Sequence, residues 1–171
     1  MELRKIRLNK KGSIEDVFFL IVTLLGLALF IIVVAYTIGT VTTEMEKTEL
    51  NDSEAARVMF AESDKVIDKL NPVYLAVFAG LTMSIFVTAF MIHSHPIFIP
   101  IYIIEMGFAI IIAVIANHVY DEFAANADLA TIAAEQTYMT AIMGNFITIV
   151  TAVGIISMII IFAKPFQGAR V

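Results

Sequence analysis

The chain has 171 residues, of which 60% are hydrophobic and 16% are charged, and its formal net charge is −5. A soluble domain averages about 45–50% apolar and about 25% charged residues, so this composition excludes an ordinary soluble domain and indicates a membrane protein. The absence of cysteine excludes disulfide bonds, thiolate metal sites and a cysteine nucleophile.

The hydrophobic residues fall into four blocks, and each is long enough for a helix that crosses the hydrocarbon core, which requires about 20 apolar residues. Three blocks contain no Asp, Glu, Lys or Arg, and the fourth contains one acid, Glu105. We therefore predict an all-α, polytopic integral membrane protein with a single membrane domain over residues 1–171. The predicted transmembrane helices cover residues 17–41, 72–92, 97–116 and 139–163.

The charged residues divide between the two sides of the membrane that these spans would separate. The two termini together carry a net charge of +4, whereas the segments 44–71 and 117–138 together carry −8. Because cytoplasmic flanks carry the excess of Lys and Arg, we expect both termini on the cytoplasmic side, or on the interior side of a virion membrane. The basic residues are dispersed over both termini, so we expect them to fix topology and expect no specific nucleic-acid partner.

The N-terminal residues allow two interpretations. Residues 10–12 (Lys-Lys-Gly), followed by Glu15 and a long apolar helix, resemble a prepilin-type leader. This resemblance implies cleavage after Gly12 and packing of the apolar helix into a filament core. Alternatively, Ser13 caps the first helix and Asp16, three positions later, completes a start like a capping box. We favour the cap, because the chain continues into three further spans where a pilin has a soluble head.

The polar segment between the first two spans contains an amphipathic extramembrane helix over about residues 52–70, with apolar side chains on one face at helical spacing. We expect the pair Asn71-Pro72 to end this helix and to start the second span, since Pro disfavours helical geometry in the residue before it and suits a first turn. The apolar face packs on the bilayer, on its own bundle or on a neighbouring subunit. The partner-facing candidates are Met59, Phe60, Ile67 and Leu70.

Two further connections have distinct compositions. Residues 93–96 (His-Ser-His-Pro) join the second and third spans, and so short a link predicts a tight hairpin in which these two helices pack against each other. His93 and His95 have no evident third ligand, so we expect no metal site there. Residues 117–138 are rich in Ala and lack Gly and Pro, so we expect the adjoining spans to project as helices before a turn near Asn126.

Small residues at helical spacing predict the faces through which membrane helices pack, because close van der Waals contact and interhelical hydrogen bonds drive their association in lipid. The second span carries such a stripe at four-residue steps, and the fourth carries one whose members lie within about 40 degrees of one face of the helix. In the third span, two alanines share this spacing with Glu105. The predicted helix-packing residues are Ala76, Gly80, Ser84, Thr88, Ala109, Ala113, Thr140, Gly144, Thr148 and Thr151.

Glu105 is the one charged residue inside a predicted span. An acid near the middle of the bilayer costs about 2.5–3.5 kcal/mol on insertion scales and is by default a functional candidate. We expect it to face the helix interface, on the side of Ala109 and Ala113. Three roles are open: a protonated carboxyl that donates a hydrogen bond within the bundle, a group that takes or passes a proton or cation, and a partner across a subunit interface.

The sequence contains no catalytic motif and no phosphate-binding Gly loop, so we expect neither an enzyme nor a cofactor. Short loops and small-residue faces are typical of a structural or assembly subunit, here one that forms a homo-oligomer or joins a larger complex in a virion membrane or a cell-surface machine. Its expected partners are the lipid bilayer and other membrane subunits. The alternatives are a small channel or transporter subunit that uses Glu105, and a holin-like protein that disrupts the membrane.

Overall fold

The computed structural model describes residues 14–48, 53–92 and 96–163 of the chain, and within them every regular element is a helix. The elements are α1 (Ile14–Glu46), α2 (Glu54–Met91), the short 3₁₀ turn η2 (Pro96–Phe98), α3 (Ile99–Ala124), α4 (Ala130–Glu135), α5 (Thr137–Gly144) and α6 (Phe146–Ala163). Four of them, α1, α2, α3 and α6, are long and apolar enough to cross a membrane. The prediction of an all-α, multi-pass membrane protein is therefore confirmed.

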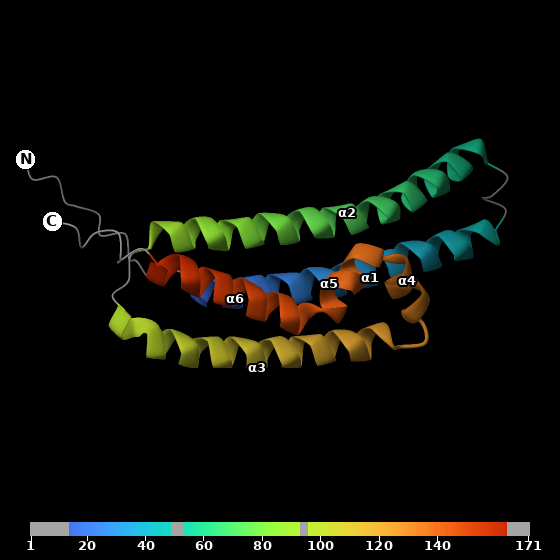
Figure 1. The fold of residues 1–171 in the computed structure, drawn as a ribbon. Helices are drawn as coiled ribbons and strands as arrows, with labels where there is room; N and C mark the ends of the chain where they lie inside the picture. Colours follow the sequence, from blue (N-terminus) through green and yellow to red (C-terminus); the bar gives the residue numbers. More distant parts are fainter. Residues whose placement is uncertain (1–13, 49–52, 93–95, 164–171) are drawn as a thin grey trace, which may run out of the picture.

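The four long helices form one elongated bundle in which α1 and α6 each pack against both α2 and α3 (Figure 1). The helices α2 and α3 consequently lie at opposite corners, with α1 and α6 between them. The predicted hairpin, in which the second and third spans pack directly on each other, is therefore wrong. Small side chains explain the difference: Ala109 and Ala113 of α3 are fully buried, and they let neighbouring helices other than α2 approach α3 closely.

The helix α2 is continuous for 38 residues and contains Pro72 in its interior. The predicted break at Asn71-Pro72, and with it a separate extramembrane helix over residues 52–70, is wrong. The apolar positions Phe60, Ile67 and Tyr74 recur every seven residues on either side of Pro72, so only an unbroken helix keeps them on one face. Phe60 is 6% exposed and Tyr74 fully buried, and the packing of this face offsets the hydrogen bond that Pro72 cannot donate.

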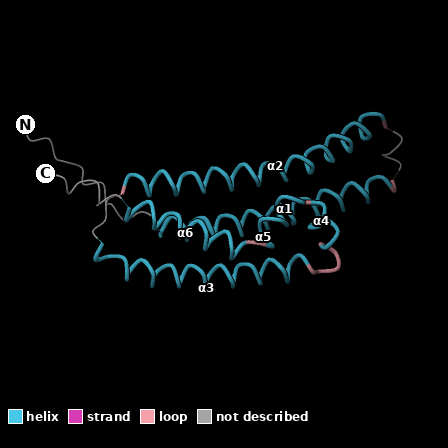
Figure 2. Tube along the Cα trace, viewed as in Figure 1, coloured by secondary structure: helices cyan, strands magenta, loops and turns pink. Residues whose placement is uncertain are grey.

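Short breaks divide the helical structure in the last part of the chain. The helix α3 runs past its predicted span to Ala124, and the turn that follows contains Asn126, as expected (Figure 2). The predicted span 139–163 is divided instead of continuous, since α5 ends at Gly144 and α6 begins at Phe146. Between them Asn145 has φ −114° and ψ 17°, and its side-chain amide donates to the carbonyl of Ala141 at 2.9 Å.

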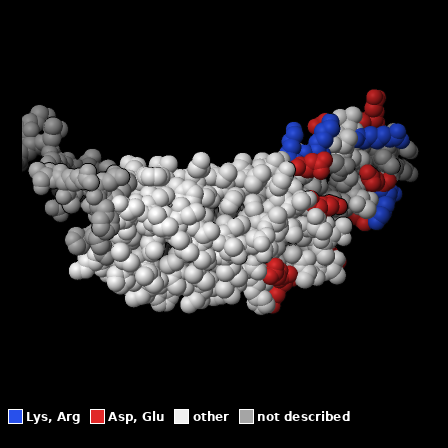
Figure 3. Space-filling view, viewed as in Figure 1, with Lys and Arg blue, Asp and Glu red and all other residues white. Residues whose placement is uncertain are grey.

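Charged side chains gather at one end of the described bundle. On the face seen in Figure 3, Lys, Arg, Asp and Glu lie toward the end where α1 stops, α2 starts and α3 finishes, while the rest of that face is free of them. We call this the acidic end. The other, terminal end is where α1 and α3 begin and α2 and α6 finish. The part of that face without Lys, Arg, Asp or Glu is the part of the bundle that the hydrocarbon core would cover.

Candidate functional site

The carboxyl group at transmembrane depth, on Glu105, lies on the exposed surface of the chain. Its neighbour Met106 is buried against α6, where a Cβ placed on Gly154 would overlap the Met106 side chain. The Tyr102 hydroxyl also donates to the Gly154 carbonyl at 3.1 Å, which fixes the rotation of α3 about its axis. This rotation buries Tyr102, Met106 and Ala109 and turns Glu105 outward, so the expectation that Glu105 faces the interface within the bundle is wrong.

Among the described residues, none pairs with Glu105 in a way that would offset the cost of a charge in lipid. Within the part of the chain that the structure describes, no hydrogen bond or ion pair reaches its carboxylate. The sequence places no Lys or Arg inside any of the four apolar blocks, so a cation from this chain is not available at that depth. A carboxyl group in this position is costly unless another molecule covers it.

The small-residue stripe of α2 also lies mainly on the outer surface. Ala76, Gly80 and Ser84 are exposed, and a Cβ built on Gly80 meets no atom within 4 Å. Thr88 is half-buried, and its side chain hydrogen-bonds to the carboxylate of Asp16 on α1. Three of these four residues therefore do not pack against their own bundle, and their packing against another chain stays a prediction.

The small-residue stripe of the fourth span also lies partly on the outer surface. Gly144 and Thr148 are exposed, and a Cβ on Gly144 meets no atom within 4 Å. Thr151 is half-buried and donates to the carbonyl of Ile147 at 2.8 Å, so its hydroxyl is satisfied by its own helix. Thr140 donates to the carbonyl of Ala133 at 2.7 Å. The face that α5 and α6 turn inward is instead a set of larger apolar side chains, namely Met139, Ile142, Met143, Phe146, Val150 and Val153.

The partner-facing candidates of α2 mostly contact their own chain. Phe60 is buried, Ile67 and Leu70 are half-buried, and Leu70 packs against the main core. Met59 alone among the four is exposed, at 58%. The apolar face of this part of α2 therefore completes the bundle.

A partly buried polar junction links α2 and α5, and sequence reasoning missed it. The Asn71 side-chain oxygen accepts the backbone N–H groups of Tyr138 at 2.9 Å and Met139 at 3.4 Å, which caps the first turn of α5. Gln136, between α4 and α5, is 2% exposed, and its side-chain oxygen has no hydrogen-bond partner. The signal available in the sequence was the polar pair Asn71 and Gln136 beside apolar blocks, but nothing in their spacing connects them.

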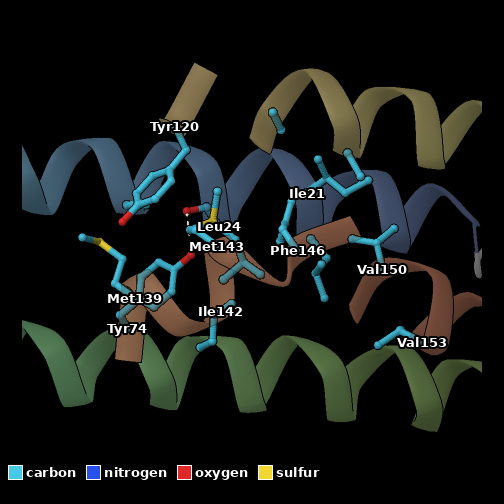
Figure 4. Packing of buried hydrophobic residues seen from close by; sticks show 14 of the residues in the cluster. Ile21, Leu24, Tyr74, Tyr120, Met139, Ile142, Met143, Phe146, Val150 and Val153 are labelled. Carbon is cyan, nitrogen blue, oxygen red and sulfur yellow. Dashed lines mark hydrogen bonds between the residues drawn. The ribbon is translucent and has the colours of Figure 1, made fainter. Parts of the chain in front are cut away.

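Two tyrosines enter the core beside this junction from opposite sides, Tyr74 from α2 and Tyr120 from α3 (Figure 4). The Tyr74 hydroxyl donates to the carbonyl of Leu24 at 3.3 Å, and the Tyr120 hydroxyl lies 3.3 Å from that of Thr140. Each hydroxyl thus has a partner inside the protein. The junction fixes the relative positions of these helices.

The acidic end holds an open groove of about 330 Å³ between α1 and α4. Its lining is mostly hydroxyl-bearing and acidic: Tyr36, Gly39, Thr40, Thr43, Glu44, Asp128, Thr131 and Ile132. Among the residues that the structure describes, no three His, Asp or Glu side chains come together as metal ligands would. His93 and His95 lie outside the described residues, as do Gly12 and Ser13 of the proposed leader or cap.

Comparison of the chain with protein-family models, with curated proteins and with solved structures found no match. The fold and the surface just described therefore carry the argument. They define a multi-pass membrane protein whose four long helices form one bundle, with polar and small residues at membrane depth on the outside of that bundle.

Proposed function

We propose that the chain is a structural subunit of the membrane, which packs laterally with other copies or with other membrane proteins into a larger assembly. The observation that supports this proposal is the outward position of Glu105 together with the exposed small residues Gly80, Ser84, Gly144 and Thr148. Small residues let helices approach closely in lipid, and a carboxyl group at this depth requires cover. A virion membrane and a cell-surface machine are the two settings in which such a subunit would repeat.

The proposed orientation has both termini on the cytoplasmic side, or inside a virion. It follows from the net charge of +4 on the termini and −8 on the segments at the acidic end. Labelling of single cysteines from either side of sealed vesicles tests it, since the natural chain has none. Labelling of Lys47→Cys from the cytoplasmic side would contradict this orientation.

The experiment that tests assembly is the mass of the complex after extraction in a mild detergent. We expect Gly80→Leu and Gly144→Leu each to reduce the mass of the complex, and Glu105→Gln to preserve it because the amide still forms hydrogen bonds. Neither glycine has an atom within 4 Å of a built Cβ, so both variants should keep the thermal stability of the protomer. Gly107→Leu is the control, since Gly107 has equally free space and lies outside both stripes. A wild-type protein that is monomeric in lipid nanodiscs would contradict the proposal.

The second candidate is a channel or transporter subunit, and Glu105 is the observation that favours it. An acid at membrane depth is typical of a group that passes a proton or cation. Liposomes with wild-type protein would then carry a flux that Glu105→Gln removes while assembly stays intact. A holin-like protein would instead release large solutes from the same liposomes.

A further inference from the structure

The outward side of α1 is the centre of one face of the bundle, because α1 packs between α2 and α3. We call this surface the α1 face. Phe19, Val22, Gly26 and Phe30 are exposed along it at three- and four-residue spacing. A Cβ built on Gly26 meets no atom within 4 Å, so there is free space above the helix backbone at that point.

Glu105 borders the α1 face on the α3 side. Successive residues of a helix are about 100 degrees apart, and Met106 points toward Gly154 of α6. Glu105, one residue earlier and on the other side of the buried Tyr102, therefore lies on the flank of α3 that faces away from α6. The other neighbour of α3 is α1, so this flank meets the α1 face.

Ser84 borders the same face on the α2 side. Thr88 hydrogen-bonds to Asp16 of α1, which places this stripe on the flank of α2 that faces α1. Ser84 lies one helical turn before Thr88 and is exposed. The α1 face thus has a hydroxyl group along one border and a carboxyl group along the other.

The two groups lie at the same depth. The helix α2 ends at Met91 and α3 begins at Ile99, both at the terminal end of the bundle (Figure 1). Ser84 precedes the end of α2 by about 10 Å and Glu105 follows the start of α3 by about 9 Å, at a rise of about 1.5 Å per residue.

We infer that the α1 face is an interface between two copies of this chain, related by a two-fold axis along the membrane normal, in which Glu105 of each copy meets Ser84 of the other. This inference rests on the proposed lateral assembly and names its contact surface. A two-fold rotation exchanges the two borders of the face at constant depth, so each carboxyl group is brought to a hydroxyl group. Both copies keep the same orientation in the membrane.

A second copy fits this face better than a different protein, because the face is complementary to itself. No Lys or Arg occurs in the apolar blocks, so the carboxyl group needs a hydrogen-bond partner, and the matching hydroxyl lies on the same face of the same chain. Gly26 lies on α1, between the two borders, and the open space beside it is where α1 would meet α1 of the second copy.

Disulfide cross-linking in native membranes tests the arrangement, and the cysteine-free chain suits it. Gly26→Cys should form cross-linked dimers when it is the only variant expressed, since Gly26 lies near the two-fold axis. Phe108 lies one turn from Glu105 and is 59% exposed in the wild type. Ser84→Cys and Phe108→Cys should cross-link to each other when the two variants are co-expressed. Neither variant should form cross-linked dimers when it is expressed alone. Ile103→Cys on α3 is the control that should stay monomeric, because Ile103 is 56% exposed and lies on the flank of α3 nearer α6, away from Glu105. Glu105→Leu should weaken the dimer about tenfold and Glu105→Gln should not.

Three outcomes would overturn this interface. They are dimers of Phe108→Cys alone, dimers of Ile103→Cys, and, in a protein that still extracts as a large complex, no cross-link from either the mixed pair or Gly26→Cys. Each of these outcomes leaves the proposed assembly intact. A protein that is monomeric in nanodiscs would remove the interface and the proposed function together.

Discussion

The side-chain oxygen of Asn71, in the middle of α2, accepts the backbone N–H of Tyr138 in the first turn of α5 at 2.9 Å. The residues are 67 positions apart in the sequence, and α5 has no side-chain cap from its own N-cap residue, Gln136. The start of α5 is therefore held by another helix, which stabilises the last third of the chain against α2.

Asn71→Ala should lower the free energy of unfolding by about 0.5–2 kcal/mol, the usual cost of losing such a cap. Thermal unfolding in detergent measures the loss, and hydrogen exchange should show faster exchange of the Tyr138 and Met139 amides. Asn145→Ala is the matched control, because the Asn145 side chain donates to Ala141 of the adjoining helix one turn away. Unchanged protection of the Tyr138 amide in Asn71→Ala would contradict the cap.

Pro72→Ala should stabilise the protein by up to about 3 kcal/mol, because it restores a backbone N–H and removes a clash within a continuous helix. The midpoint of thermal unfolding should rise accordingly. Pro100→Ala makes the comparison informative, since Pro100 lies in the first turn of α3, where proline suits the backbone, and its loss should give no gain. Equal effects of the two substitutions would mean that α2 is broken at Pro72.

Gly154→Leu should destabilise the contact between α3 and α6 by about 1–3 kcal/mol, because a side chain at this position overlaps Met106. Gly154→Ala should cost less, since the flexible end of Met106 can move aside. Gly39→Leu provides the control, as a Cβ on Gly39 meets no atom within 4 Å. Chemical unfolding in mixed micelles gives the three values, and a loss in Gly39→Leu as large as that in Gly154→Leu would rule out this explanation.

Tyr74→Phe should cost about 0.6 kcal/mol, the average for a hydrogen bond between membrane helices, because it removes only the donor to the Leu24 carbonyl. Tyr74→Ala should cost about 3–5 kcal/mol, since it leaves a cavity at a fully buried position. Unfolding of both variants under one condition separates the two contributions. A Phe variant as unstable as the Ala variant would show that the hydroxyl group dominates.

Composition and hydrophobic blocks predicted the helices that cross the membrane, because lipid imposes a length and an apolar character that are visible in the sequence itself. Ala109 and Ala113, two of the predicted helix-packing residues, are fully buried within the bundle. Local rules failed where distant contacts decide the outcome. Pro72 predicted a break by its own geometry, but the packing of Phe60 and Tyr74 on one face keeps the helix continuous.

The sequence identified Glu105 as an acid inside a span, but it did not predict which way the side chain faces. Periodicity placed Glu105 near the buried side of α3, within about 60 degrees of Tyr102, and an error of that size separates burial from exposure. The decisive contacts are those of Tyr102 and Met106 with Gly154, which set the rotation of α3 and lie about 50 residues away in the sequence. No pattern within the third span contains that information.

The unequal lengths of the long helices determine what the protein shows to solution. At a rise of about 1.5 Å per residue, α2 extends about 57 Å and α1 about 50 Å, whereas α6 extends about 27 Å and a hydrocarbon core is about 30 Å thick. The ends of α1 and α2 at the acidic end therefore extend beyond a hydrocarbon core of that thickness, and the groove lined by Glu44 and Asp128 runs along the end of α1. A molecule that approaches from that side meets these helix ends before it reaches the lipid.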